Sequence, residues 1–156
     1  MILHFAYGAN MNRAVMQKHA PNAQPIGVAA LRNHRFVITA TGYASVEERR
    51  NVTVCGVLWR LTPHDRITLD VWENVAAGLY RAEVLPVCHA GQRRMALTYV
   101  AQARSSGRAK PGYMELVIAA ALEWRLPHTY IASLRRFLPR HSGDANPPKI
   151  EEFGWT

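Results

Sequence analysis

Residues 52–74, VTVCGVLWRLTPHDRITLDVWEN, carry the two strongest structural signals in the chain, a strand and a helix joined without a loop. The first part, 52–61, is rich in β-branched and apolar residues and is typical of a buried strand. Thr62 then suits a helix N-cap, and Pro63 suits the first helical position. A strand that leads directly into a capped helix predicts a chain of mixed strands and helices.

The helix is expected to run from Pro63 to about Glu73. Asp65 stands three residues after Thr62, where its carboxylate can complete a capping box. Asn74 tolerates the left-handed backbone conformation that ends a helix. Glu73 is therefore expected in the last turn, at the negative end of the helix dipole.

The chain upstream opens with a second strand-to-helix transition. Residues 2–7 read as a buried strand, and Asn10 or Asn12 can cap a short helix that reaches about His19. Pro21 and Pro25 predict a loop after it. Two further strand-like segments are 27–39 and 44–46, with a turn at 41–43 between them. The charged residues from Glu47 to Asn51 are expected to form a loop or a hairpin tip.

The chain downstream is expected to add two strands, two helices and an irregular tail. In order these are strands 79–87 and 94–102 with a turn around Ala90-Gly91, a polar loop at 105–112, helices 113–124 and 126–137, and a tail at 139–156. Strands of this number and length can close into a small barrel, which removes exposed sheet edges. We therefore predict an α+β fold in a single domain over 1–156: a small mixed β-barrel with short helices inserted and two helices appended.

Composition narrows the class of protein. The chain has 156 residues and 49% hydrophobic content, enough for one core. No apolar run approaches the roughly 20 residues that span a bilayer, and the first residues lack the basic region and long apolar run of a secretory signal. We therefore expect a soluble cytoplasmic protein without a membrane partner. Cys55 and Cys88 form no CxxC motif and are expected to be buried free thiols. The seven His residues show no zinc-like spacing, so no metal is expected.

The net charge of +8 and the pI of about 10.1 raise the alternative of a small barrel that binds nucleic acid. The basic residues are scattered, however, in groups no larger than pairs such as Arg49-Arg50 and Arg93-Arg94. They are not interleaved with aromatic residues and form no nucleic-acid motif. A solvated basic surface without a nucleic-acid partner is the better interpretation, and its field attracts anionic substrates.

Two features have the chemistry of a site. Tyr7-Gly8-Ala9-Asn10 stands where a strand gives way to a helix, so that backbone N–H groups without helical partners can bind a carboxylate or a developing oxyanion. Glu73 is expected to have a raised pKa, because the helix dipole and burial beside Trp72 both disfavour its charged form. Such a carboxyl suits a general base that must later return the proton. Read alone, the first feature is better explained as an ordinary turn and the second as a solvent-facing Glu. Tyr80 and Tyr113, which each begin an apolar element, are read alone more often core tyrosines.

Taken together, the motifs resemble the γ-glutamylcyclotransferase superfamily. In order they are FAYGANM (5–11), GVLWRLT (56–62), LDVWENV (69–75), GLYRAEV (78–84), KPGYMELVIAAA (110–121) and LPHTY (126–130). The resemblance covers nearly the whole chain and implies the fold of that superfamily, a small mixed α/β barrel. It also implies its reaction: the α-amine of a γ-glutamyl amide attacks the γ-carbonyl of the same molecule and releases 5-oxoproline and an amine or amino acid. No cofactor or metal is implied.

The resemblance also assigns roles to residues. The catalytic glutamate of the superfamily falls on Glu73. The loop that cradles the substrate falls on Tyr7, Gly8, Ala9 and Asn10, and the tyrosines of the site fall on Tyr80 and Tyr113. The arrangement requires Glu73 in the same pocket as the backbone of Gly8, with Tyr113 at the rim. Relatives form dimers, which makes a homodimer one alternative for this chain, and they act in γ-glutamyl peptide and glutathione metabolism.

Three positions depart from the pattern of the superfamily. Ala9 replaces the serine of YGSN, so that only the backbone can donate there. Asn74 replaces a glycine, and Asn10 stands where the glutathione-specific branch has leucine. The last difference favours γ-glutamyl amino acids or amines over glutathione. The alternative to an enzyme is a non-catalytic relative that binds a small acidic metabolite, which fits the lost hydroxyl but not the carboxylate of Glu73.

Overall fold

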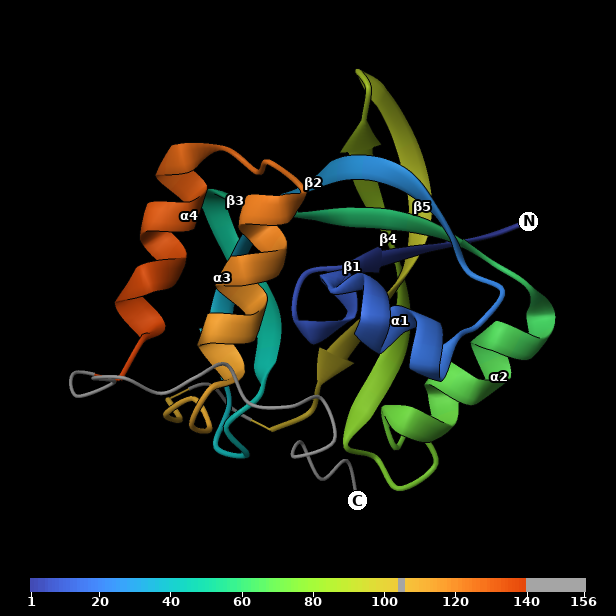
Figure 1. The fold of residues 1–156 in the computed structure, drawn as a ribbon, viewed down its shortest axis with the longest axis horizontal. Coiled ribbons are helices and arrows are strands. Elements are labelled where there is room, and N and C mark those ends of the chain that lie inside the picture. The colour runs from blue at the N-terminus through green and yellow to red at the C-terminus, as the bar shows by residue number, and fades with distance from the viewer. Residues whose placement is uncertain (104–105, 140–156) are drawn as a thin grey trace.

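The fold is a closed barrel of five strands, as predicted, in the spatial order β1-β3-β2-β4-β5. The computed structural model describes residues 1–103 and 106–139, so most of the tail expected at 139–156 lies outside the described residues. The strands are β1 (Ile2–Ala6), β2 (Gln24–Ile38), β3 (Ala44–Leu61), β4 (Tyr80–His89) and β5 (Gln92–Ala101). Figure 1 shows the barrel at the centre of the molecule, with the β4–β5 hairpin rising above it.

The barrel is one closed sheet whose ladders differ in length. β3 pairs with both β1 and β2 in antiparallel ladders, and β4 pairs with β5 over its whole length. The sheet closes at two seams, each formed in the described structure by one residue pair. At one seam His4 of β1 lies opposite Leu97 of β5, and at the other Ala30 of β2 lies opposite Cys88 of β4.

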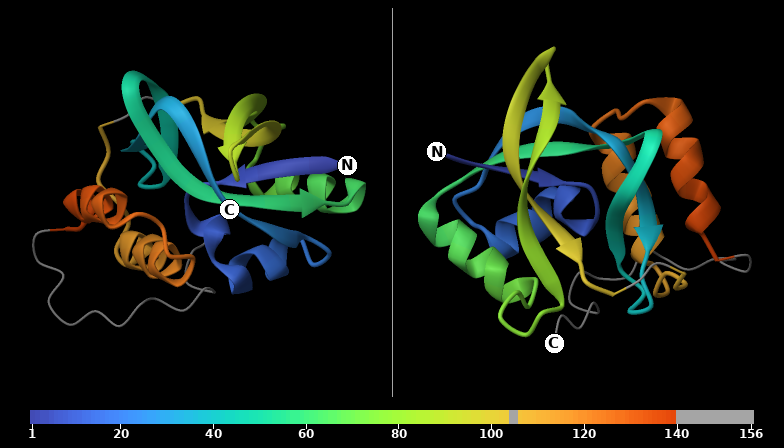
Figure 2. Two further views of the ribbon diagram at one scale, coloured as in Figure 1. Left: turned by 90° about the horizontal axis from the view of Figure 1, so that it is seen from above. Right: turned by 180° about the vertical axis from the view of Figure 1, so that it is seen from behind.

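Helices cover the outside of the barrel and connect its strands. They are the 3₁₀ helix η1 (Ala9–Met11), α1 (Arg13–His19), α2 (Pro63–Trp72), α3 (Tyr113–Glu123), α4 (His128–Leu134) and the 3₁₀ helix η2 (Arg135–Phe137). α3 and α4 lie side by side at one end of the molecule and α2 lies at the other (Figures 1 and 2). The predicted order, with short helices inserted and two appended, is confirmed. No helix in the described part of the chain is both long and apolar enough to cross a membrane.

The start of α2 has the predicted capping box. Oγ1 of Thr62 accepts a hydrogen bond from the backbone N–H of Asp65 at 3.1 Å, and a carboxylate oxygen of Asp65 accepts one from the N–H of Thr62 at 3.0 Å. The other carboxylate oxygen of the buried Asp65 accepts from the N–H of Asn22 at 3.2 Å, which ties the helix to the loop after α1. At the far end Glu73 is the C-cap, and Asn74 adopts a left-handed φ of 50° as expected. Both ends of α2 are therefore fixed by local sequence.

The loop or tip predicted from Glu47 to Asn51 is wrong. β3 continues through this segment, in which Glu47 and Glu48 pair with Arg35 and His34 of β2. The chain reverses at 39–43, where the predicted turn at 41–43 is confirmed. The charges are compatible with a strand because they lie on an exposed two-stranded ribbon, where Glu47 forms an ion pair with Arg35 across the ladder. The ladder is irregular at the end of this segment, where a register shift separates the pair of His34 with Glu48 from the pair of Arg32 with Thr53.

Two smaller expectations also need correction. Pro25, expected in a loop, lies in β2 at a register shift, where the ladder tolerates a residue without an N–H. Cys55 and Cys88 are free thiols as expected, but both are half-buried and not fully buried.

Candidate active site

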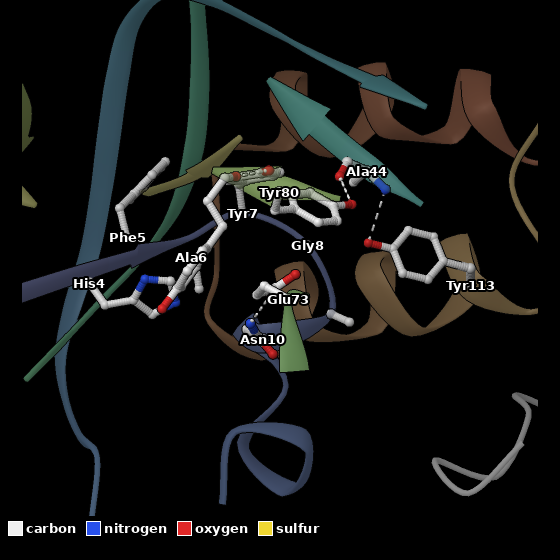
Figure 3. Close-up of a pocket in the computed structure, with 12 residues that line it drawn as sticks. His4, Phe5, Ala6, Tyr7, Gly8, Asn10, Ala44, Glu73, Tyr80 and Tyr113 are labelled. Atoms are coloured by element: carbon white, nitrogen blue, oxygen red, sulfur yellow. Dashed lines mark hydrogen bonds between the residues drawn. The ribbon is translucent and has the colours of Figure 1, made fainter. Parts of the chain in front are cut away.

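A pocket lies where β1 ends and where the last turn of α2 approaches it (Figure 3). Its wall contains every residue that the sequence singled out: Tyr7, Gly8, Ala9, Asn10, Glu73, Tyr80 and Tyr113. These residues come from β1 and its following turn, from the end of α2, and from the first residues of β4 and α3. The fold therefore brings together groups as distant in the chain as Tyr7 and Tyr113, which are 106 positions apart.

The turn after β1 is built by backbone hydrogen bonds. The carbonyl oxygens of Gly8 and Ala9 accept from the N–H groups of Met11 and Asn12, at 3.1 and 2.9 Å. Asn12, one of the two predicted caps, accepts from the N–H groups of Ala14 and Val15 through its side chain and so starts α1. The other candidate, Asn10, is thereby left to point its side chain into the pocket.

Glu73 meets Asn10 across the pocket. Nδ2 of Asn10 donates a hydrogen bond to Oε1 of Glu73 at 3.1 Å (Figure 3). Burial raises the pKa of Glu73 to about 7, and the hydrogen bond from Asn10 partly opposes this rise. The predicted raised pKa is thus found, with burial as its main cause. A carboxyl with such a pKa is present in both protonation states near neutral pH, so it can accept and return a proton.

The tyrosine hydroxyls of the pocket are fixed by the backbone. Tyr80 donates to the carbonyl oxygen of Ala44 at 2.8 Å, and the N–H of Ala44 donates to the hydroxyl of Tyr113 at 3.3 Å (Figure 3). The hydroxyl of Tyr7 donates to the carbonyl oxygen of Tyr99. Burial raises the pKa of all three phenols, so they stay neutral at ordinary pH. They form a rigid, uncharged wall around Glu73.

Tyr113 is not at the rim of the pocket, as was predicted, but in its wall, with 3% of its surface exposed. Its hydroxyl explains the glycine at position 8. A Cβ added to Gly8 would lie 2.7 Å from that oxygen and 3.5 Å from Cβ of Ala44. Gly8 has a φ of −118°, so close approach, not a left-handed conformation, requires the glycine.

Five pocket residues were not predicted: His4, Phe5, Ala6, Ala44 and Tyr99. His4 is 2% exposed, and its Nδ1 lies 2.9 Å from the carbonyl oxygen of Leu97. Tyr99 donates from its hydroxyl to Oδ1 of Asp70 at 2.6 Å, which ties the last turn of α2 to β5. One signal in the sequence could have found His4, because it is a histidine inside the apolar run of β1, whereas Ala44 and Tyr99 look like ordinary strand residues.

The residues that the structure describes do not include a set of side chains arranged to bind a metal ion. Within 1–103 and 106–139, no group of three or more His, Cys, Asp or Glu side chains is arranged to hold a metal ion. The pocket has a single carboxylate, Glu73, and its other polar groups are phenols, an imidazole, an amide and backbone. Such a set is suited to proton transfer and to hydrogen bonding.

Comparison with known proteins gives consistent relatives. Residues 53–134 match the AIG2-like family. The human protein named gamma-glutamylcyclotransferase is 25% identical over 97% of this chain and 86% of its own, and the bovine protein of that name is 26% identical over the same shares. A solved structure titled gamma-glutamyl cyclotransferase superposes with a TM-score of 0.84 at 23% identity, over 93% of each chain. YkqA from Bacillus subtilis has a TM-score of 0.77 at 27% identity, over 86% of this chain and 53% of its own.

Proposed function

Because the chain belongs to the AIG2-like family, we propose that its pocket is the active site of a γ-glutamyl amide cyclotransferase, which releases 5-oxoproline and an amino acid or amine. One observation carries the proposal. Glu73, a carboxyl with a pKa of about 7, lies in the same pocket as the backbone of Gly8. Curated relatives named gamma-glutamylcyclotransferase support the same chemistry.

In the proposed mechanism Glu73 acts first as the general base. It takes one proton from the α-ammonium group of the substrate and frees the lone pair of the nitrogen. The amine attacks the γ-carbonyl carbon, and a new C–N bond closes the five-membered ring. Glu73 then gives its proton to the leaving nitrogen as the old C–N bond breaks. The ring nitrogen still carries two protons, and Glu73 takes the second one, which leaves the lactam N–H of 5-oxoproline. Glu73 passes this proton to the released amine, which departs as an ammonium group, so that protons balance over the cycle. Acid–base catalysis of this kind contributes roughly 10²–10⁴ in rate.

The turn after β1 is proposed to hold the oxygen of the attacked carbonyl. Its carbonyl groups at Gly8 and Ala9 are used within the turn, so its N–H groups are the side that can bind an oxyanion. Ala9 contributes no hydroxyl, so this binding uses backbone donors, each worth roughly 10²-fold or more in such sites. Asn10 holds Glu73 and leaves its second carboxylate oxygen for the substrate.

One observation favours a second candidate function, a non-catalytic relative that binds a small acidic metabolite. Ala9 is buried and lacks the hydroxyl expected at this position. Against this candidate, an ionised Glu73 would repel an acidic ligand in a pocket whose other side chains carry no charge at neutral pH. The cyclotransferase is therefore the proposal that the pocket supports best.

The test is a direct assay for 5-oxoproline. The purified protein is incubated with γ-glutamyl-alanine, a panel of γ-glutamyl amides and glutathione, and the product is measured by mass spectrometry. We expect 5-oxoproline from γ-glutamyl amino acids or amines in preference to glutathione, and none from Glu73→Gln. Glu123→Gln is the matched control, because Glu123 is exposed at the end of α3 and pairs with Arg13. Failure of the wild type on every substrate would overturn the cyclotransferase in favour of the binding protein.

A further inference from the structure

His4 has one ring nitrogen engaged and the other unpaired. Its Nδ1 lies 2.9 Å from the carbonyl oxygen of Leu97. A carbonyl oxygen only accepts, so Nδ1 carries the proton, and Nε2 has a lone pair and acts only as an acceptor. The ring packs edge-on against Tyr99, with 5.5 Å between the ring centroids, which further fixes its orientation.

A purely structural role would explain only one of the two ring nitrogens of His4. Nδ1 of His4 joins β1 to β5 at the seam where His4 and Leu97 are the paired residues. That contact does not use Nε2, which is buried and has no hydrogen-bond partner among the described residues. A buried acceptor without a partner carries a desolvation penalty that native structures usually avoid. An unpaired acceptor in a pocket wall is therefore a sign of a missing ligand.

His4 lines the same pocket as Glu73. His4 and Ala6 lie on one face of β1, and Figure 3 shows the His4 ring on the side of the pocket where Asn10 and Glu73 meet. The pocket wall thus contains a carboxylate, Glu73, and an imidazole, His4, whose Nε2 is an acceptor without a hydrogen-bond partner among the described residues. Two such acceptors in one pocket match a ligand group with several N–H donors.

We propose that Nε2 of His4 accepts a hydrogen bond from the α-amino group of a γ-glutamyl substrate, beside Glu73, and that this pair selects substrates with a free α-amine. The inference rests on the proposed function. An ammonium group has three N–H bonds, so it can donate to His4 and to Glu73 together. After Glu73 has taken its proton, the N–H held by His4 keeps the nitrogen oriented with its lone pair toward the γ-carbonyl.

The chemistry of His4 suits this role. Burial lowers the pKa of its imidazole to about 4, with the hydrogen bond to Leu97 only partly opposing the shift. The ring therefore stays neutral where Glu73 works and does not compete for the proton of the ammonium group. A substrate acylated on its α-nitrogen would have only one N–H to offer to the two acceptors.

Two substitutions separate the role of Nδ1 of His4 from the role of its Nε2. The amide of His4→Asn reaches the position of Nδ1, so it keeps a donor for Leu97 and loses the acceptor in the pocket. The amide of His4→Gln reaches the position of Nε2 and does the reverse. We expect kcat/KM for γ-glutamyl-alanine to fall roughly 10- to 100-fold in His4→Asn, the loss of one hydrogen bond to a charged group, and to fall much less in His4→Gln. The opposite order would show a structural role at the seam and overturn the proposal.

Binding supplies an arm that does not depend on turnover. Calorimetry in the Glu73→Gln background compares γ-glutamyl-alanine with glutaryl-alanine, the same ligand without the α-amine. We expect His4→Asn to weaken the first ligand roughly 10-fold or more and to leave the second unchanged. Equal weakening of both ligands, or no weakening, would overturn the proposal, as would the absence of binding by either ligand. If the wild type makes no 5-oxoproline but this difference is found, the cyclotransferase fails while the amine site at His4 stands.

Discussion

Removal of the Asn10 amide tests whether Glu73 is the base. Asn10 donates to Oε1 of Glu73 at 3.1 Å and lowers the pKa of that carboxyl, which burial sets to about 7. A hydrogen bond to a charged group is worth about 1.5–3 kcal/mol, and each pKa unit corresponds to about 1.36 kcal/mol. Glu73 is intermediate in solvent exposure, so the lower end of this energy range applies. Asn10→Ala should therefore raise the pKa by about one unit.

The assay is the pH profile of kcat/KM for 5-oxoproline formation. Since the base must be ionised, the ascending limb should move from about pH 7 to about pH 8 in Asn10→Ala, with a roughly 10-fold loss at pH 6 and little loss at pH 9 from this cause. Asn12→Ala is the matched control. It removes the cap of α1 and about 1 kcal/mol of stability, but it should leave the limb in place. A limb that does not move in Asn10→Ala, or that moves to lower pH, refutes Glu73 as the titrating base.

Three further predictions concern stability and sterics. Glu73→Gln should stabilise the protein by about 1–3 kcal/mol at pH 8, because the folded-state pKa is raised from 4.5 to about 7, and the gain should vanish at pH 4.5 in urea unfolding. Gly8→Ala should lower kcat/KM at least about 10-fold, because its Cβ displaces the Tyr113 hydroxyl. Adding Tyr113→Phe removes that oxygen and should restore the stability that Gly8→Ala loses in thermal unfolding. If the stability losses of the two substitutions instead add, the clash is contradicted. Burial lowers the pKa of His19 to about 4, so wild-type Tm should fall as pH drops from 6.5 to 4, and His19→Phe, which keeps the ring stack on Trp72, should fall less; equal slopes would reject this source.

Much of the fold was readable because its signals are local. The capping box of Thr62 and Asp65 and the left-handed Asn74 bracket α2 within the range 62–74, so no distant contact is needed to place it. The segment from Glu47 to Asn51 failed for the opposite reason. Its charges are typical of a loop, and the pairing of Glu47 and Glu48 with Arg35 and His34 of β2 is what extends the strand into it. Local composition cannot report such a partner.

In the candidate site, too, residues recognisable from local sequence could be predicted, and residues that depend on distant contacts could not. Glu73 and Gly8 could be chosen for their chemistry and for their places at the ends of elements, and the fold brings them into one pocket. The role of the tyrosines was harder to foresee, because Tyr113 has its hydroxyl on the backbone of Ala44 in the wall of the pocket. His4 shows the limit most clearly. Whether a lone histidine in an apolar strand has a spare acceptor depends on the carbonyl of Leu97, which is 93 positions away.

The seam between β1 and β5 links ligand binding to the stability of the barrel. The pocket takes His4 from β1, Tyr7 from the turn after β1, and Tyr80 and Tyr99 from β4 and β5. In the described residues the ladder between β1 and β5 has one pair, His4 with Leu97, so a molecule in the pocket touches both strands where the barrel has little backbone pairing. By linkage, a ligand at 100 times its Kd adds about 2.7 kcal/mol to the folded state. A bound substrate would stabilise the contact between β1 and β5, and this stabilisation would be lost each time the product leaves.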